Sequence, residues 1–349
     1  MTTHYLFRSR AEALALAIHR QSFRRCLVMV AVTLGLLLVY LCLGSTRIPP
    51  MDVIATLVSP DTSDHRFVIQ TLRLPRALLA LLVGAGLGVS GALLQQIVRN
   101  PLASPDIIGI SDGAALGAVL FLAWFAGTVS LTWLPPVAIA SAALTATIIY
   151  ALAWKPGGTT AVAPIRLVLV GIALAAALKA VATLVLVMSP LSTTVQAYIW
   201  LTGTVYGAQW QDVTRLLPWT LTLIPVAMLA ARALTLLGMN DEQSKGLGLA
   251  VGKYRLLLLA CSVGLAGSAV AFAGGMAFVG LMAPHLARRY TGQTSTGLIL
   301  GAGLTGACLV LLADLLGRVA FLPQDLPAGI FVSGVGAPFF IYLLYRRRA

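Results

Sequence analysis

Few side chains in this sequence could take part in chemistry, and they lie far apart along the chain. Asp314 stands in an apolar stretch four residues before Arg318, and this spacing lets the two side chains pair on one helix. Lys179 interrupts another apolar stretch, where an unpaired lysine costs about 2.5–3.5 kcal/mol on membrane-insertion scales. His285 has no second potential ligand beside it, so we interpret it as structural. None of these residues forms a catalytic constellation.

Sequence motifs of common enzymes are also missing. The sequence contains no G-x-x-x-x-G-K-[ST] phosphate loop, no H-E-x-x-H and no G-x-S-x-G, so we do not expect this chain to hydrolyse ATP by the phosphate-loop route. Four cysteines lie singly in apolar segments without C-x-x-C spacing, which argues against disulfides and metal ligation: Cys26, Cys42, Cys261 and Cys308. We therefore predict no enzyme activity, no metal site and no cofactor.

The composition indicates a polytopic membrane protein. Of the 349 residues, 59% are hydrophobic and only 10% are charged, and the mean hydropathy is +0.92. Water-soluble domains of this size carry more charge. The 33 glycines suit closely packed membrane helices, because small residues allow helix backbones to approach. We therefore predict an all-α fold within a lipid bilayer.

The hydrophobic pattern divides the chain into a basic N-terminal segment, residues 1–25, and one transmembrane domain, residues 26–349. The N-terminal apolar run lacks a small-residue cleavage site, so we expect it to stay attached as the first span. A span needs about 20 apolar residues. The pattern predicts about ten transmembrane helices: 26–44, 76–97, 107–127, 135–154, 166–188, 213–232, 254–274, 277–290, 297–316 and 326–345. Pro49 and Pro50 predict a short surface helix that continues to Val58.

The distribution of Lys and Arg predicts the orientation of the chain. With the N-terminus in the cytoplasm and ten spans, 17 Lys and Arg residues lie on the cytoplasmic side and 6 on the outer side. This asymmetry agrees with the positive-inside rule and places both termini in the cytoplasm. The net charge of +13 therefore reflects membrane topology, and no nucleic-acid partner is needed to explain it.

Two segments resemble each other weakly. Residues 76–105 and 254–288 each consist of a small-residue-rich helix, an apolar run and a proline-containing break, and they cross the predicted membrane in opposite senses. This suggests that spans 2–5 and 7–10 form an inverted repeat, as in many transporters. The alternative is a chance similarity between two helices rich in Gly and Ala.

One of the longest polar interruptions between the hydrophobic segments is 234–252, LTLLGMNDEQSKGLGLAVG. Asn240 can cap a helix that starts at Asp241, and Gln243 occupies the third helical position, as in a capping box. Asp241 and Glu242 suit the first turn and Lys245 the last, because the helix dipole favours these charges there. The segment is either a surface connector or a rigid element on which a soluble partner docks.

Five motifs in order resemble the FecCD family: residues 73–110, 236–248, 274–288, 313–318 and 326–344. This family comprises the permease subunits of binding-protein-dependent ABC importers for iron(III)-siderophores, haem and vitamin B12. The resemblance extends from about residue 45 to the C-terminus. VRNPLASPDIIGI and IWLTGTVYGAQW are most similar to ferric-citrate and ferric-siderophore members.

The resemblance implies the partners and the location. It implies a second permease subunit, identical or a paralogue, two ATP-binding subunits, a soluble substrate-binding protein, and a multi-pass chain in the bacterial inner membrane. It also implies that 234–252 is the region that couples the permease to the ATPase. Within that region we expect exposed contacts from Asp241, Glu242 and Lys245, and apolar contacts from Leu237, Met239 and Leu247.

The resemblance also implies roles for residues on the outer side and along the pathway. Arg73, Arg76 and Arg318 match arginines that receive acidic residues of the binding protein, for which the guanidinium fork is suited. Their alternative roles are lipid anchoring and, for Arg318, the pair with Asp314. Lys179 either faces the translocation pathway and attracts an anionic chelate, or it snorkels or forms a local hydrogen bond. Pro164 and Ile165 match a cytoplasmic gate position.

We therefore expect the permease subunit of an ABC importer for an iron(III)-siderophore. The first alternative is a haem or cobalamin permease of the same family. The second is a secondary transporter driven by an ion gradient, which would need no ATPase. An integral membrane enzyme would require catalytic residues that the sequence does not supply.

Overall fold

The computed structural model describes residues 4–8, 15–60, 63–154, 164–292 and 294–346. A short antiparallel pair of strands, β1 (His4–Arg8) and β2 (Ala15–His19), precedes the helices. Everything described after β2 is helical or loop, which confirms the all-α prediction for the body of the protein. The helices are α1 (Arg20–Cys42), α2 (Pro50–Val58), α3 (Leu74–Val98), α4 (Ile110–Trp124), α5 (Leu134–Ala153), α6 (Pro164–Met188), α7 (Leu191–Thr202), α8 (Trp210–Leu229), α9 (Ala231–Leu237), α10 (Asp241–Gly246), α11 (Val251–Ala273), α12 (Val279–Thr291), α13 (Ser295–Val319) and α14 (Ala328–Arg346).

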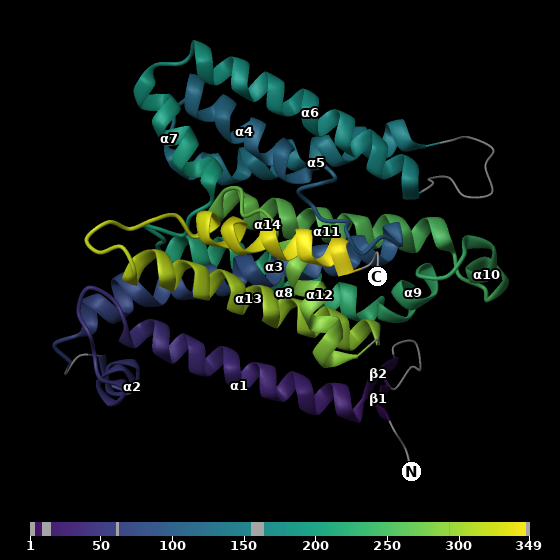
Figure 1. Ribbon diagram of the computed structural model, residues 1–349, viewed down its shortest axis with the longest axis horizontal. Coiled ribbons are helices and arrows are strands. Elements are labelled where there is room, and N and C mark those ends of the chain that lie inside the picture. Colours follow the sequence, from purple (N-terminus) through teal and green to yellow (C-terminus); the bar gives the residue numbers. More distant parts are fainter. Residues whose placement is uncertain (1–3, 9–14, 61–62, 155–163, 293, 347–349) are drawn as a thin grey trace.

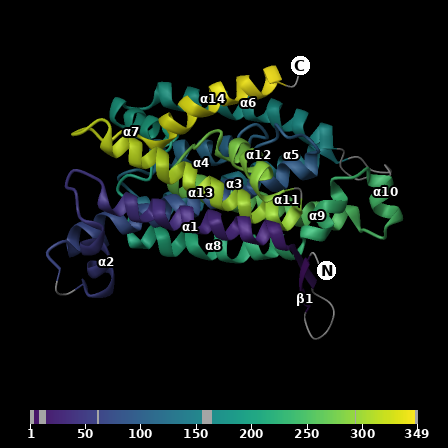
Figure 2. The ribbon, with the colours of Figure 1, turned by 60° about the horizontal axis from the view of Figure 1, so that its bottom comes forward.

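The long helices run roughly along the longest dimension of the molecule (Figure 1). Helices α2 and α7 lie toward one end and α10 at the other in both views (Figure 1 and Figure 2), and in Figure 1 α1 and α6 run along opposite edges of the bundle. Helix α3 is central, packing against α8, α11, α12 and α13. Its N-terminus is extended by a π-helical segment, Phe67–Arg73, which lies before residue 76, where the sequence pattern predicts that this span starts.

Six helices in the described part are long and apolar enough to span a membrane: α1, α3, α5, α6, α11 and α13. The bent pair α8 and α9, which meet at 61°, makes a seventh if it counts as one span. Helices α4 and α14 are apolar but shorter, and α12 has only 13 residues, although the pattern predicts a span at each. The described residues thus contain six or seven candidate spans of an integral membrane protein, fewer than the ten predicted.

Backbone contacts between glycines hold the central helices together. A Cβ atom at Gly84 of α3 would lie 2.2 Å from the carbonyl oxygen of Gly306 in α13, and one at Gly306 would lie 2.1 Å from that of Gly84. A Cβ atom at Gly91 would lie 1.8 Å from the carbonyl oxygen of Gly280 in α12. Such distances exclude any side chain, so α3, α12 and α13 pack directly through their backbones.

Two predictions of local structure are confirmed. Helix α2 begins at Pro50 and ends at Val58, as the proline pair indicates, because proline has a suitable φ and needs no hydrogen bond at a first helical position. Helix α10 follows Asn240 and has Asp241 and Glu242 in its first turn and Lys245 in its last. The predicted capping box is wrong, however, since the Asn240 side chain makes no cap hydrogen bond.

Candidate functional site: two ion-pair clusters and a buried lysine partner

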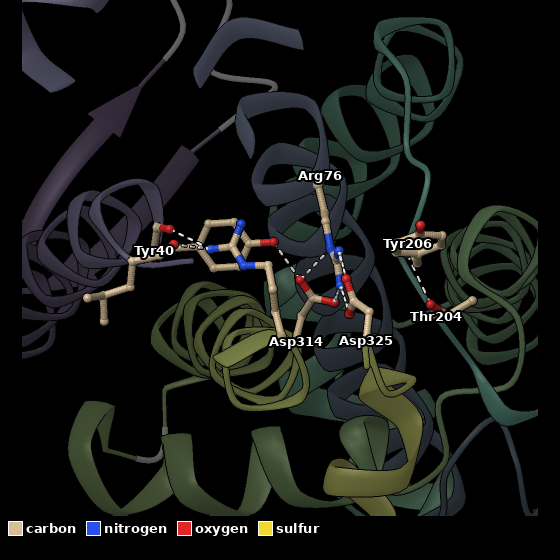
Figure 3. Close-up of polar contacts among 8 residues, drawn as sticks. Tyr40, Arg76, Thr204, Tyr206, Asp314 and Asp325 are labelled. Atoms are coloured by element: carbon tan, nitrogen blue, oxygen red, sulfur yellow. Dashed lines mark hydrogen bonds and ion pairs between the residues drawn. The ribbon is translucent and has the colours of Figure 1, made fainter. Parts of the chain in front are cut away.

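The first cluster lies at the end of the bundle opposite α10, where Arg76 of α3 meets two aspartates (Figure 3). Arg76 donates from Nε and Nη2 to Asp314 of α13, at 2.8 Å each. It also donates from Nη1 and Nη2 to Asp325, in the loop after α13, at 2.7 and 2.8 Å. The hydroxyl of Tyr40 in α1 donates to Asp314 at 2.5 Å. Bidentate pairing of this kind fixes the positions of α1, α3 and α13 relative to one another.

The other two arginines of this cluster bind backbone carbonyls. Arg73 donates to the carbonyl oxygens of Leu41 and Thr46, both at 2.6 Å, and is only 3% exposed. Arg318 donates to the carbonyl oxygens of Tyr40 and Leu43 at 2.7 and 2.8 Å, and its guanidinium lies 4.2 Å from the centroid of the Tyr40 ring. The expected pair of Asp314 with Arg318 is therefore wrong: Asp314 pairs with Arg76, which approaches from another helix.

All three arginines line one cavity of about 820 Å³ between the N-terminus of α3, the C-terminus of α13 and the start of α8. The ring of Tyr206, on the loop before α8, faces Arg76 with 5.3 Å from its centroid to the guanidinium carbon (Figure 3). Arg73 and Arg76 are buried, whereas Arg318 is partly exposed and uses one guanidinium nitrogen for both of its hydrogen bonds. Of the three, Arg318 keeps the most capacity to bind a further carboxylate.

The second cluster lies at the α10 end and surrounds Asp241. Arg99, which ends α3 in the left-handed conformation at φ 55°, pairs with the Asp241 carboxylate and donates to the carbonyl oxygen of Leu237 at 2.9 Å. Arg255 of α11 donates to Asp241 at 2.8 Å. Burial disfavours the charged carboxylate, but the hydrogen bonds from Arg255 and Arg99 outweigh it and hold the pKa of Asp241 below its ordinary value. The carboxylate thus joins α10 to α3 and α11.

Two residues of this region that we expected to contact the ATPase are buried. Asp241 is 8% exposed because its carboxylate points inward to the two arginines, so its predicted exposure is wrong. Leu237, predicted as an apolar contact, is fully buried against the core and is not on the surface. Glu242 and Lys245 are exposed as expected, and Met239 and Leu247 are 43% and 64% exposed.

Lys179 in α6 has an acidic partner that the local sequence pattern does not single out. Its Nζ lies 3.4 Å from a carboxylate oxygen of Asp112 in α4, whose side chain is only 13% exposed, while that of Lys179 is 67% exposed. The sequence does contain a signal for this partner, since Asp112 is an acidic residue within a predicted span.

In the loop just before α4, Asp106 accepts hydrogen bonds from the Ser111 hydroxyl and the Phe278 amide, at 2.8 and 3.3 Å.

The remaining predicted site residues lie at the start of α6. Pro164 is the first residue of the helix and is partly buried, and Ile165 is 72% exposed.

Among the described residues no group of three or more His, Cys, Asp or Glu side chains could hold a metal ion. His285 packs edge-on against the ring of Phe339, 5.7 Å between ring centroids.

Ionisable side chains placed among membrane-spanning helices are costly and mark candidate functional sites, and here they gather at both ends of α3. A family model described as the FecCD transport family matches residues 30–346. The chain is 46% identical over 324 residues to the achromobactin transport system permease protein CbrC of Dickeya dadantii, a match that covers 93% of this chain and 92% of that protein. It is 40% identical to the Fe(3+)-citrate import system permease protein YfmE of Bacillus subtilis, covering 91% and 93% of the two chains.

A solved structure shows the same fold. The inward-facing structure of a metal-chelate type ABC transporter matches with a TM-score of 0.80 at 27% identity, covering 93% of this chain and 99% of that one. The chain therefore belongs to the FecCD transport family. It is a permease component of an ABC transporter and not an enzyme, as the sequence indicates.

Proposed function

We propose that this chain forms the membrane pathway for import of an iron(III)-siderophore across the bacterial inner membrane. The observation that carries the proposal is the 46% identity to an achromobactin permease over nearly the whole of both chains. The relatives described above are named for achromobactin and Fe(3+)-citrate, which favours an iron chelate over haem or cobalamin. Both termini lie in the cytoplasm in this proposal, as the excess of Lys and Arg there supports.

In the proposed topology the chain crosses the membrane ten times. Helices α4, α12 and α14 are three of these crossings, although each is too short to span the bilayer without its neighbouring helices. Spans 2–5 and 7–10 are then related as inverted repeats. A second permease subunit, a paralogue or a second copy, completes the pathway. Apolar residues exposed on α6 and α14 support such a partner, for example Val187 at 79% and Ile341 at 66% exposed.

The exposed residues around α10 form the proposed contact with one of two ATP-binding subunits. Met239 and Leu247 offer apolar area beside the charged Glu242 and Lys245. We assign Asp241 and Leu237 a different task within the coupling region. They anchor α10 to the permease, so that a displacement of α10 by the ATPase moves the C-terminal end of α3 through Arg99 and the N-terminal end of α11 through Arg255.

At the other end, the 820 Å³ cavity is the proposed docking site of an acidic residue of the soluble binding protein. Arg318 is the proposed direct contact, because its guanidinium is partly exposed and retains free donors. Arg73 and Arg76 shape the cavity wall, since their own hydrogen bonds hold α1, α3 and α13 in place.

Lys179 lines the proposed pathway, but Asp112 partly neutralises it, which weakens its attraction for an anionic chelate. Pro164 and Ile165 form part of the cytoplasmic gate in this proposal.

Uptake of radiolabelled iron tests the proposal directly. Cells that carry the chain with its operon partners are offered labelled iron as achromobactin, citrate and hydroxamate chelates, and haem and labelled cobalamin in parallel. We expect accumulation of an iron chelate that disappears when the ATP-binding subunit is deleted. Accumulation that survives this deletion would point to an ion-gradient transporter, and accumulation of haem or cobalamin alone would refute the siderophore assignment.

A further inference from the structure

A second cavity, of about 410 Å³, opens between α5, α8 and α11. Its floor consists of fully or nearly fully buried residues, among them Leu94 of α3, Ile110 of α4 and Leu259 of α11. Its rim includes the exposed Leu256 of α11 and Trp219 of α8, which are 50% and 36% exposed. We call this cavity the α5–α11 groove.

The chemistry of the α5–α11 groove suits hydrocarbon. Nearly all its lining side chains are aliphatic or aromatic, and the hydroxyl of the one lining threonine, Thr147, donates to the Ala143 carbonyl oxygen of its own helix at 2.8 Å. A polar solute inside the groove would lose hydrogen bonds to water without replacement. The walls come from α5 and α11, both long and apolar enough to span the membrane, so the groove lies at the depth of acyl chains.

A basic side chain, that of Lys253, lies beyond the groove toward the α10 end. Leu256 and Ala260 line the groove and lie three and seven residues after Lys253, so all three share one face of α11. Lys253 is exposed and forms no ion pair or hydrogen bond within the described part of the chain. On α6, Arg166 is likewise exposed and without a described partner, and it directly precedes the lining residue Leu167.

Tyr150 supplies a polar atom at the same end of the groove. It lies near the C-terminus of α5, and its ring contacts Trp154 at 5.8 Å between centroids. Its hydroxyl has no hydrogen-bond partner among the described residues. Tyrosine and tryptophan side chains prefer the region of lipid headgroups. The groove therefore has an apolar body and a cationic, hydrogen-bonding mouth.

We propose that the α5–α11 groove binds one anionic phospholipid, with an acyl chain along Leu256 and Ala260 and its phosphate between Lys253 and Tyr150. The charge of the mouth argues for an anionic headgroup, since a basic side chain near a membrane surface attracts such lipids. The helix α11 that forms one wall starts at Val251, shortly after α10, so the lipid would sit beside the proposed ATPase contact. The lipid site itself does not depend on the transport proposal.

Native mass spectrometry of the purified chain, with any partner subunits that remain bound, tests the lipid site by titration with phosphatidylglycerol and phosphatidylcholine of matched acyl chains. We expect preferential binding of phosphatidylglycerol, and an affinity about fivefold lower in Lys253→Gln with binding of phosphatidylcholine unchanged. Lys245→Gln is the matched control, because Lys245 is also exposed at the same end but lies on α10, which does not line the groove.

A variant that fills the groove tests where the acyl chain lies. Ala260→Trp should abolish retention of both lipids, whereas Ala180→Trp, an exposed position of α6 outside the groove, should retain them. Equal binding of the two lipids by the unmodified chain would overturn the proposal, as would equal losses in Lys253→Gln and Lys245→Gln. If Ala260→Trp does not fold, the surface variant Lys253→Gln still decides the question.

Discussion

Arg76 and Arg99 stand at opposite ends of α3, and each is ion-paired to residues of other segments. Arg76 holds Asp314 and Asp325 at one end, and Arg99 holds Asp241 at the other. They are separated by about 35 Å of helix, since each residue adds about 1.5 Å. One rigid helix thus connects the proposed binding-protein site with the proposed ATPase contact.

This connection predicts that Asp241 matters for coupling more than for ATPase binding. In Asp241→Asn the amide cannot balance the charges of Arg99 and Arg255, and α10 loses its tie to α3 and α11. We expect stimulation of ATP hydrolysis by the loaded binding protein to fall by about 5- to 150-fold, the usual range of coupling between sites. The ATP-binding subunits should still co-purify at the wild-type ratio.

Glu242→Gln is the matched control for Asp241→Asn. It removes the neighbouring carboxylate, which is exposed. This variant should weaken retention of the ATP-binding subunits while the remaining complexes stay coupled. If Asp241→Asn also loses the ATP-binding subunits and Glu242→Gln has no effect, Asp241 would be a direct contact and its role as an internal anchor would be wrong.

The low pKa of Asp241 predicts how the α10 anchor responds to pH. Because the folded-state pKa lies below the ordinary value of about 3.9, this pair adds stability that is fully present above that value. The stability is lost only as the pH falls through the folded-state pKa. Hydrogen-exchange protection of α10, corrected for intrinsic rates, should therefore be constant from about pH 5 to pH 8, a window that lies wholly above both values. A loss of protection within that window would contradict this assignment.

Arg76 should be essential for stability. Arg76→Ala leaves the fully buried Asp314 carboxylate without its cation, and breaking a buried pair costs about 3–5 kcal/mol. Arg76→Lys should recover only part of this, because an ammonium cannot form two bidentate pairs. Thermal unfolding followed by tryptophan fluorescence measures both. Arg215→Ala, an exposed arginine on α8, should unfold like wild type.

The glycine contacts of α3 predict that two Gly→Ala substitutions at different positions differ strongly in their effect on thermal stability. Gly84→Ala would place a Cβ 2.2 Å from a backbone oxygen of α13, and overpacking of this kind costs typically about 1–3 kcal/mol. Gly35→Ala in α1 is the control, because beyond the local backbone of its own helix no atom lies within 4 Å of the position that its new methyl group would take. Its thermal midpoint should equal or exceed that of wild type, since alanine favours helix. Equal midpoints for the two variants would refute the close packing.

The pair of Lys179 and Asp112 predicts a non-additive effect on uptake. Lys179→Met leaves the largely buried Asp112 carboxylate unpaired, and Asp112→Asn leaves Lys179 uncompensated. If their pairing is what matters, the double variant should transport iron chelate better than either single variant. If Lys179 instead attracts the chelate directly, Asp112→Asn should transport at least as well as wild type and the double variant as poorly as Lys179→Met.

The ends of some helices are set by residues next to them in the sequence, and these helices can be predicted. The two prolines at the start of α2 and the order of charges along α10 are such signals, and both helices lie where the signals place them. The start of α3 differs from its predicted position because the polar-looking segment 67–73 continues the helix as a π-helix. Short helices such as α12 cannot be counted as spans from hydropathy alone, because adjacent helices cover them.

Side-chain pairing cannot be predicted in the same way. Arg76 and Asp325 are 249 residues apart, and nothing in the local pattern near either residue indicates the other. The i, i+4 rule favours Asp314 with Arg318, but the fork of Arg76 from α3 reaches the carboxylate and Arg318 turns to the end of α1. Likewise, Asp241 has the sequence position of an exposed first-turn acid, and only the packing of α3 and α11 shows that it is buried.

The contact of Gly84 with Gly306 and of Gly91 with Gly280 has a mechanical consequence. Backbones that touch without intervening side chains leave no room for one helix to slide along or roll over the next. We therefore expect helices α3, α12 and α13 to move as a single body, with few internal degrees of freedom. The opening and closing of a pathway would fall to joints elsewhere, where the packing is looser, as along the exposed α6.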